Sequence, residues 1–166
     1  MKLLVRTIAL QGANFQFSIF NFQFPKKVMN LTEHFTLEEF TRSEIASMCD
    51  IDNAMPEQYI PAAQNLCAAI LEPLRNYAQE PVIISSGYRC PLLNDKVGGV
   101  KNSQHTKGEA ADIYHPESAT LKRWFTWIQD NTSFDQLIFE GRRNSHWIHV
   151  SCRTDPSLNR QQILRR

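Results

Sequence analysis

The chain has 166 residues, of which 42% are hydrophobic and 21% are charged, and its 18 basic and 17 acidic side chains leave a net charge of +1. That composition excludes a disordered or fibrous chain and predicts one globular domain, alone or with a tail. The near-zero charge argues against nucleic-acid binding through a broad basic surface. Because no run of 18 apolar residues occurs, we expect no transmembrane helix.

The first 28 residues differ from the rest, since they contain four basic and no acidic residues together with five of the ten phenylalanines. A basic start is typical of a signal peptide, but polar residues within 11–16 interrupt the apolar stretch and no small-residue cleavage motif follows. The phenylalanines partly alternate, which leaves an added edge strand open. We favour an N-terminal extension at 1–28 that is poorly ordered, loosely docked or not native, because ordinary domain composition begins at Met29.

The rest of the chain is predicted to form one α+β domain over 29–154, followed by a basic, polar and solvated tail at 155–166. Thr36 and Glu39 form a capping box, the reciprocal hydrogen-bonding pair that begins a helix. Apolar residues at helical spacing predict a longer helix over 59–78. Three apolar side chains of the first helical region should face inward: Leu37, Phe40 and Ile45.

Short apolar runs and turn-forming residues divide the remainder into strands, loops and one more helix. Ser118 is placed to cap that helix, whose apolar residues recur at i, i+3, i+4 and i+7. The stretch 87–108 is rich in Gly, Asn, Ser and Lys and should be mostly loop. The expected strands lie at 82–86, 108–114, 135–140 and 147–152, with a hairpin at 141–145 between the last two.

Four cysteines are spread along the chain without CxxC spacing, which argues against a structural zinc knuckle. We expect four reduced and mostly buried thiols, with a single disulfide as the alternative. Reduced thiols fit synthesis in a reducing compartment. The four are Cys49, Cys67, Cys90 and Cys152.

Three side chains could form a metal site. Alternate residues of a strand share a face, so Asp112 and His149 would project into one cleft if their strands were neighbours, while His105 lies just before the first of these strands. Two imidazoles and one carboxylate suit zinc and leave a fourth position for water, which such a site activates for amide hydrolysis. Spacing alone leaves open a structural carboxylate at Asp112 and a core histidine at His149.

Five spaced motifs follow one another along the chain. They are Ser86-Gly-Tyr-Arg89, Leu93-Asn94 with Val97-Gly-Gly99, Ser103-Gln-His105 with Gly108-Glu-Ala-Ala-Asp112, Phe134-Asp-Gln-Leu-Ile138 with Glu140, and Trp147-Ile-His149-Val-Ser151. Together they resemble the motifs of the M15 family of zinc D-alanyl-D-alanine carboxypeptidases. The resemblance covers about 33–152 and implies the fold shared with the Hedgehog signalling domain, an antiparallel sheet backed by helices. The most similar members occur in phages, prophages and bacteria and act on peptidoglycan stem peptides.

The resemblance implies one zinc ion per chain, held by His105, Asp112 and His149. It places Arg89 near the substrate carbonyl or carboxylate, a task that suits a planar and permanently charged guanidinium, with a surface ion pair as the alternative. It also gives Ser103 a part in binding the end of the substrate, although a serine there could simply cap a turn.

One position departs from the family pattern. Several branches place a glutamate, the general base, three residues before the last histidine, and this chain has His146 there. A histidine can accept a proton near neutral pH. On a regular strand, however, His146 would point away from His149 and could help only from the preceding turn. Glu140 is the other candidate for proton transfer.

The resemblance therefore predicts a zinc-dependent peptidase that hydrolyses D-amino-acid peptide bonds of peptidoglycan, in the manner of a D,D-carboxypeptidase. The alternative is a non-catalytic, zinc-containing module that binds cell wall or protein. We expect a monomer whose partner is a peptidoglycan peptide. Without a clear signal peptide, it would be made in the cytoplasm and reach the wall by another route, or act as a phage component. Specificity is expected in the loops 90–102 and 141–146.

Overall fold

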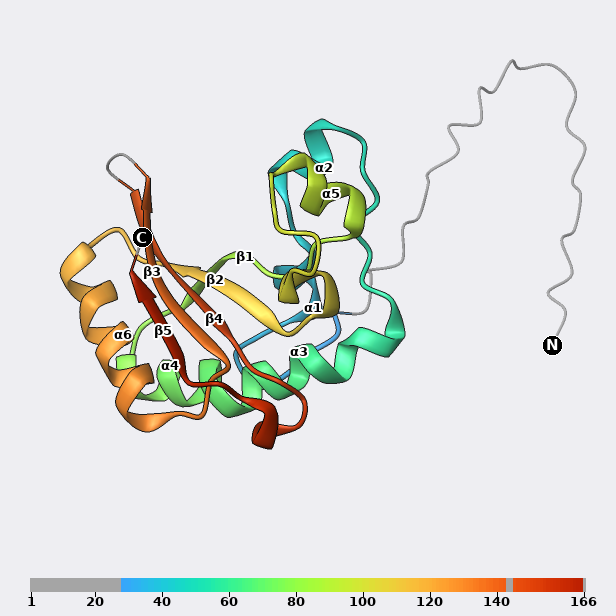
Figure 1. Cartoon of the computed structure of the whole chain (residues 1–166). Helices are drawn as coiled ribbons and strands as arrows, with labels where there is room; N and C mark the ends of the chain where they lie inside the picture. Colours follow the sequence, from blue (N-terminus) through green and yellow to red (C-terminus); the bar gives the residue numbers. More distant parts are fainter. Residues whose placement is uncertain (1–27, 143–144, 166) are drawn as a thin grey trace, which may run out of the picture.

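The computed structural model describes residues 28–142 and 145–165, so the extension expected at 1–28 lies outside the described residues except for Val28. The described part is built on a five-stranded sheet with the strand order β1-β2-β4-β3-β5 (Figure 1). All neighbouring strands are antiparallel except β3 and β5, which are parallel. The strands are β1 (Ile83–Ser86), β2 (Ala110–Tyr114), β3 (Gln136–Arg142), β4 (Ser145–Ser151) and β5 (Gln162–Arg165).

The helix expected over 59–78 is confirmed as α3 (Ile60–Leu66), a π-helical turn η2 (Cys67–Leu71) and α4 (Glu72–Ala78). The π-helical turn ends immediately before Glu72-Pro73, and Pro73 has no N–H to continue the ordinary hydrogen-bond ladder. The helix ends at Gln79, whose φ of 56° is left-handed. A second long helix, α6 (Ser118–Asn131), contacts α4, β3 and β4. Ser118 is its first helical residue, and Glu117 rather than Ser118 occupies the N-cap position.

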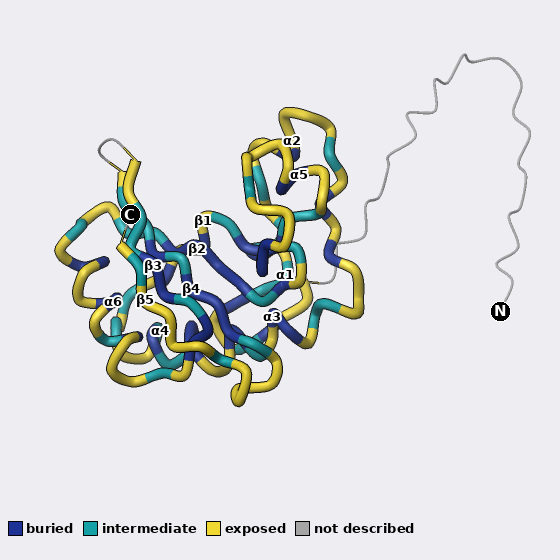
Figure 2. The backbone as a smooth tube through the Cα atoms, viewed as in Figure 1, coloured by how far each residue is buried: buried dark blue, intermediate teal, exposed yellow. Residues whose placement is uncertain are grey.

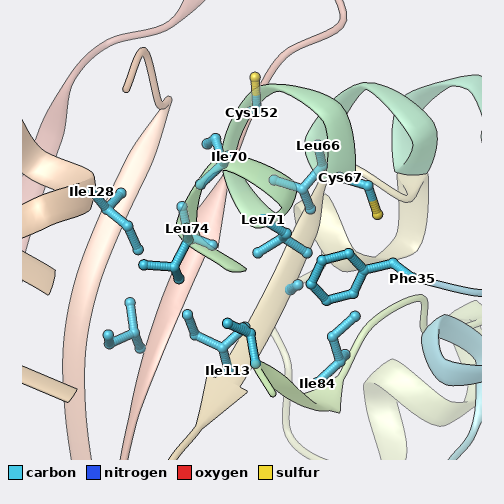
Figure 3. Close-up of a cluster of buried hydrophobic side chains, with 14 of the residues drawn as sticks. Phe35, Leu66, Cys67, Ile70, Leu71, Leu74, Ile84, Ile113, Ile128 and Cys152 are labelled. Carbon is cyan, nitrogen blue, oxygen red and sulfur yellow. The ribbon is translucent and has the colours of Figure 1, made fainter. Parts of the chain in front are cut away.

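The two long helices bury one face of the sheet. Figure 3 shows the meeting of helical side chains such as Leu66 and Leu74 with sheet side chains such as Ile84 and Ile113. On β4, Ile148 is fully buried in this layer, and the tube of β2 is mostly dark blue in Figure 2. Alternate strand residues face the other side, which these helices leave uncovered, and this second face holds the candidate site.

Three short helices lie beside the sheet: α1 (Leu37–Thr41), α2 (Glu44–Met48) and α5 (Pro91–Lys96). The capping box of Thr36 and Glu39 is confirmed at the start of α1. Ile45 does not face inward, because α1 ends at Thr41 and a new helix capped by Ser43 turns Ile45 outward, where it is 43% exposed. The stretch 87–108 is mostly loop, as expected, and it also contains α5, which begins at Pro91, a residue that favours the first turn of a helix.

All four cysteines are free thiols in the structure, as expected from their spacing. Cys67 and Cys152 are buried, whereas Cys49 is exposed. Burial raises the pKa of the Cys67 thiol well above its usual range, so this group is an inert part of the core. Within the described part of the chain, no helix combines the length and the apolar character needed to cross a bilayer.

The tail expected at 155–166 is largely exposed in its described part, and it also contains a strand that the sequence did not predict, since Gln162–Arg165 forms β5 at the edge of the sheet. The tail is held by Asp135, a carboxylate whose side chain is 0% exposed. Arg160 donates from Nε and Nη2 to the two oxygens of Asp135, both at 2.8 Å. Gln162 N–H then donates to the Asp135 carbonyl at 2.9 Å, which begins the parallel pairing.

Asp135→Asn should lower the free energy of unfolding by about 1–3 kcal/mol, the usual cost of weakening a charged hydrogen-bond pair. Burial alone would raise the pKa of Asp135, but the hydrogen bonds and charges of Arg160 and Arg153 outweigh it and lower the pKa. The stabilisation is therefore present above the unfolded-state pKa of about 3.9 and is lost as the pH falls through the lower folded-state pKa.

Urea unfolding of both proteins between about pH 7 and about pH 3 tests this linkage, and the difference between them should shrink at the acidic end. Asp130→Asn, a change at an exposed carboxylate on α6, should stay within about 0.5 kcal/mol of the parent throughout. If Asp135→Asn lowers the free energy of unfolding equally at every pH, the stabilisation does not come from the ionised form of Asp135.

Candidate metal centre

Two of the three predicted ligands come from neighbouring strands. Asp112 of β2 and His149 of β4 are directly paired in the antiparallel register, so their side chains leave the sheet on the same face. His105 comes from the short 3₁₀ helix η3 (Gln104–Lys107), which ends at Gly108 just before β2. Gly108 has a φ of 71°, and an added Cβ would lie 2.8 Å from the Tyr59 carbonyl oxygen, so only glycine fits this return into the strand.

The three side chains converge on a common point. His149 Nδ1 lies 2.9 Å from Asp112 Oδ1, His105 Nε2 lies 3.2 Å from the same oxygen, and the two histidine nitrogens are 3.1 Å apart. Ligand atoms at about 2.0–2.2 Å from one tetrahedral zinc ion are separated by about 3.3 Å. The observed triangle is slightly smaller, so the residues present fit a zinc ion with little rearrangement, and His105 Nε2, Asp112 Oδ1 and His149 Nδ1 would hold it.

A backbone carbonyl orients the most buried ligand. His105 is 2% exposed, and its Nδ1–H donates to the Gly87 carbonyl oxygen at 2.7 Å. That hydrogen bond fixes the tautomer and leaves the lone pair of Nε2 for a metal. Gly87 can occupy this place because it has no side chain, since an added Cβ would lie 2.6 Å from the Phe40 carbonyl oxygen.

Arg89 fixes the carboxylate from the other side. Its Nη2 donates to Asp112 Oδ2 in a short hydrogen bond, and its Nε donates to Ser86 Oγ at 2.8 Å. Burial would raise the pKa of Asp112, but its interactions with His105 and His149 outweigh burial and hold the pKa far below its usual range. Asp112 is therefore an ionised carboxylate, the form that binds a cation.

These groups lie at the floor of an open cleft of about 620 Å³. The cleft-facing residues of β3 form the floor beside His149, and the loop that includes Val97 and Val100 forms a wall. Glu140 and Trp147 are paired across β3 and β4 at one end of that floor. The cluster is thus reachable by a peptide-sized ligand from the face that the long helices leave uncovered.

The sequence model of the family described as Peptidase M15 matches residues 33–151. The chain belongs to this family. His105, Asp112, His149 and Arg89 all lie within the matched residues, and the α+β fold agrees with an α+β peptidase fold. No curated protein matches the chain at a significant level.

The structure does not bring His146 to the cluster. Its strand β4 is regular from Ser145 onward, and His146 pairs with Gly141 on the face opposite to His149. The His146 ring lies 5.7 Å from the ring of Phe139, centroid to centroid, and would touch a Cβ added at Gly141. The condition under which His146 could assist, a place in the turn before the strand, is therefore not met.

The sequence left two roles open for Ser103, a turn cap and a contact with the substrate, and its place in the structure is compatible with both. It caps η3, since its Oγ accepts a hydrogen bond from His105 N–H at 3.3 Å, and it also lines the cleft. Sequence reasoning missed Gln136, Arg153 and Arg160, which line the opposite end of the cleft from Glu140. Alternation along β3 could have indicated Gln136, but no local pattern indicates the two arginines.

A second group of possible ligands, Glu33, His34 and Glu72, also lies within 4.8 Å of one another. Glu33 and His34 are exposed. Glu72 already accepts hydrogen bonds from the Thr32 hydroxyl at 2.6 Å and from the His34 backbone N–H at 3.3 Å. These contacts hold the segment before α1 against the start of α4. A structural role of this kind explains why the three residues lie together without a metal ion.

Replacement of any of the three converging residues should abolish stoichiometric zinc binding. His105→Ala, Asp112→Ala and His149→Ala should each weaken zinc by more than the roughly 10- to 100-fold typical of outer-shell partners. Elemental analysis after dialysis, together with a competition titration against a chromogenic chelator, measures this. His34→Ala is the matched control, and it should keep one zinc ion per chain. Loss of zinc in the control alone would move the site to the second cluster.

Proposed function

We propose that this protein is a zinc-dependent peptidase that hydrolyses D-amino-acid-containing peptide bonds in the stem peptides of peptidoglycan, as D,D-carboxypeptidases do. The observation that carries the proposal is the convergence of His105, Asp112 and His149 within 3.2 Å of one another at the floor of an open cleft. Three protein ligands with one open position are typical of catalytic zinc, whereas structural zinc sites use four.

Zinc held by these three residues would polarise the scissile carbonyl and lower the pKa of a water molecule, which suits amide hydrolysis at neutral pH. The chain supplies the remaining groups. Arg89 uses Nε and Nη2 on Ser86 and Asp112, and its Nη1 is left for a substrate oxygen. A fixed guanidinium beside the reacting carbonyl stabilises the negative charge that develops there.

Glu140 is the residue we assign to proton transfer. It lines the cleft, on the same face as the metal ligands and two residues along β3 from Ile138, the partner of His149. A carboxylate in this place can accept a proton from the attacking water and donate it to the leaving amine. His146 lies on the other face of the sheet, so Glu140 takes the role that other branches give to a glutamate near the last histidine.

The shape of the cleft agrees with a peptide substrate of modest size. Ser103 and the loop residues Val97 and Val100 form one wall, and the two valines lie within the region 90–102 in which specificity is expected. We further propose that the protein acts on the cell-wall side of the membrane as a monomer, since the substrate class lies there and one chain contains the complete set of ligands.

Digestion of purified peptidoglycan, with mass spectrometry of the released peptides, tests the proposed function. The zinc-loaded protein should release D-amino acids or short D-amino-acid peptides, and a chelator should stop the release until zinc is restored. If the protein binds one zinc ion yet yields no product from any stem peptide, it is instead a non-catalytic, zinc-containing binding module.

Glu140→Gln should reduce kcat by about 10² or more, because general acid–base catalysis contributes at least that factor, while zinc content stays at one per chain. His146→Ala is the matched control, and it should change kcat by less than about threefold, since its ring packs against Phe139 on the opposite face. Steady-state kinetics on a synthetic stem peptide measures both. The reverse pattern, with His146→Ala the slow variant, would transfer the proton-transfer role to His146.

A further inference from the structure

Two arginines at one end of the cleft have no role in the chemistry described so far. Arg153 follows β4 and Arg160 precedes β5, and both line the cleft together with Gln136. Their side chains are 30% and 50% exposed, so they are accessible to a molecule in the cleft. Both lie beyond the residues 33–151 that match the family model.

Two carboxylates, the buried Asp135 and the partly buried Glu109, hold the two guanidinium groups in place. Asp135 accepts from Nε and Nη2 of Arg160 at 2.8 Å, and it lies 3.3 Å from Nε of Arg153. Glu109 accepts from Nη1 of Arg153 at 3.3 Å. Among the described residues, Nη1 of Arg160 and Nη2 of Arg153 have no hydrogen-bond partner. Each arginine therefore keeps one terminal nitrogen for a ligand.

The register of the sheet places Gln136, which lines the same end of the cleft as the two arginines, relative to the metal centre. Gln136, Ile138 and Glu140 follow one another along the cleft floor, and Ile138 is paired with His149. Residues two apart in a strand are separated by about 7 Å. Gln136, and with it the end of the cleft that it shares with the arginines, thus lies about one such step from the metal centre, on the side opposite to Glu140. One or two residues of an extended peptide span that distance.

We propose that Arg153 and Arg160 form a subsite that binds a carboxylate of the substrate, one or two residues from the scissile bond. Arginine forms strong, directional hydrogen bonds to carboxylates, and two fixed guanidinium groups that each present a free N–H make a suitable receptor. The proposal rests on the proposed function, because the metal centre defines the scissile bond. On a stem peptide the carboxylate could be the C-terminal one or that of D-glutamate.

Peptide binding tests the subsite without dependence on turnover. Calorimetric titrations use three synthetic stem pentapeptides: one with both carboxylates free, one amidated at the C-terminus and one amidated at D-glutamate. In the zinc-loaded Glu140→Gln protein, one of the two amidations should weaken binding by about 10- to 100-fold, as expected for a lost charged hydrogen bond. The amidation that weakens binding shows which of the two carboxylates occupies the subsite. Adding Arg160→Gln, or Arg153→Gln, should reduce that penalty to less than about threefold.

The decisive readout is the ratio of the dissociation constants of the amidated and the carboxylate peptide. If Arg160 had a purely structural role, its replacement would weaken the binding of both peptides alike. Arg123→Gln, at an exposed arginine of α6, is the matched control and should keep the full penalty. The subsite is excluded if the pentapeptide does not bind, if neither amidation matters, or if the penalty survives both arginine changes. If the protein binds the carboxylate peptide more tightly than the amidated one but the parent enzyme cleaves no stem peptide, only the proposed function is contradicted. If the parent enzyme cleaves stem peptides but binds both peptides equally well, only the subsite is contradicted.

Discussion

The direct pairing of Asp112 with His149 across β2 and β4 is the constraint on which the rest of the site depends. Side chains alternate along a strand, so a slip of one residue between these strands would turn His149 onto the opposite face. The core prevents that slip, because Ile148 and Val150 on β4 and Ala111 on β2 are all fully buried against the helices. Hydrophobic burial on one face therefore determines how far apart the ligand atoms lie on the other.

The third ligand depends on close backbone approaches that only glycine allows. Gly108 returns the chain from η3 into β2 with a left-handed φ of 71°, and Gly87 brings its carbonyl oxygen within 2.7 Å of His105 Nδ1. A side chain at Gly87 would collide with the backbone of Phe40 in α1. These two glycines are thus part of the site, since they give His105 its position and its tautomer. The short helix α1 packs against Gly87 through the backbone of Phe40.

Sequence could predict the features that follow from local patterns, and missed those that depend on distant contacts. Alternation and position along the chain were enough to propose Asp112, His149 and His105 as one cluster, on the condition that the two strands are neighbours, and the resemblance then identified all three as zinc ligands. The orientation of His146 depended on whether β4 is regular from Ser145, which the hairpin sequence does not determine. The strand β5 has only four residues and no clear alternation, and it forms because Arg160 reaches Asp135, 25 residues earlier, which no local pattern reveals.

Asp135 connects the edge of the fold to the chemistry of the cleft. A fully buried carboxylate is costly unless it is paired and hydrogen-bonded, and here Arg160 and Arg153 supply those partners while each keeps one terminal nitrogen without a partner among the described residues. An arginine that is already ordered by a buried carboxylate of the protein loses little conformational entropy when it binds a carboxylate of the substrate. The contacts of Asp135 that hold β5 beside β3 therefore also preorganise the end of the cleft, so one carboxylate and its two arginines serve both stability and recognition.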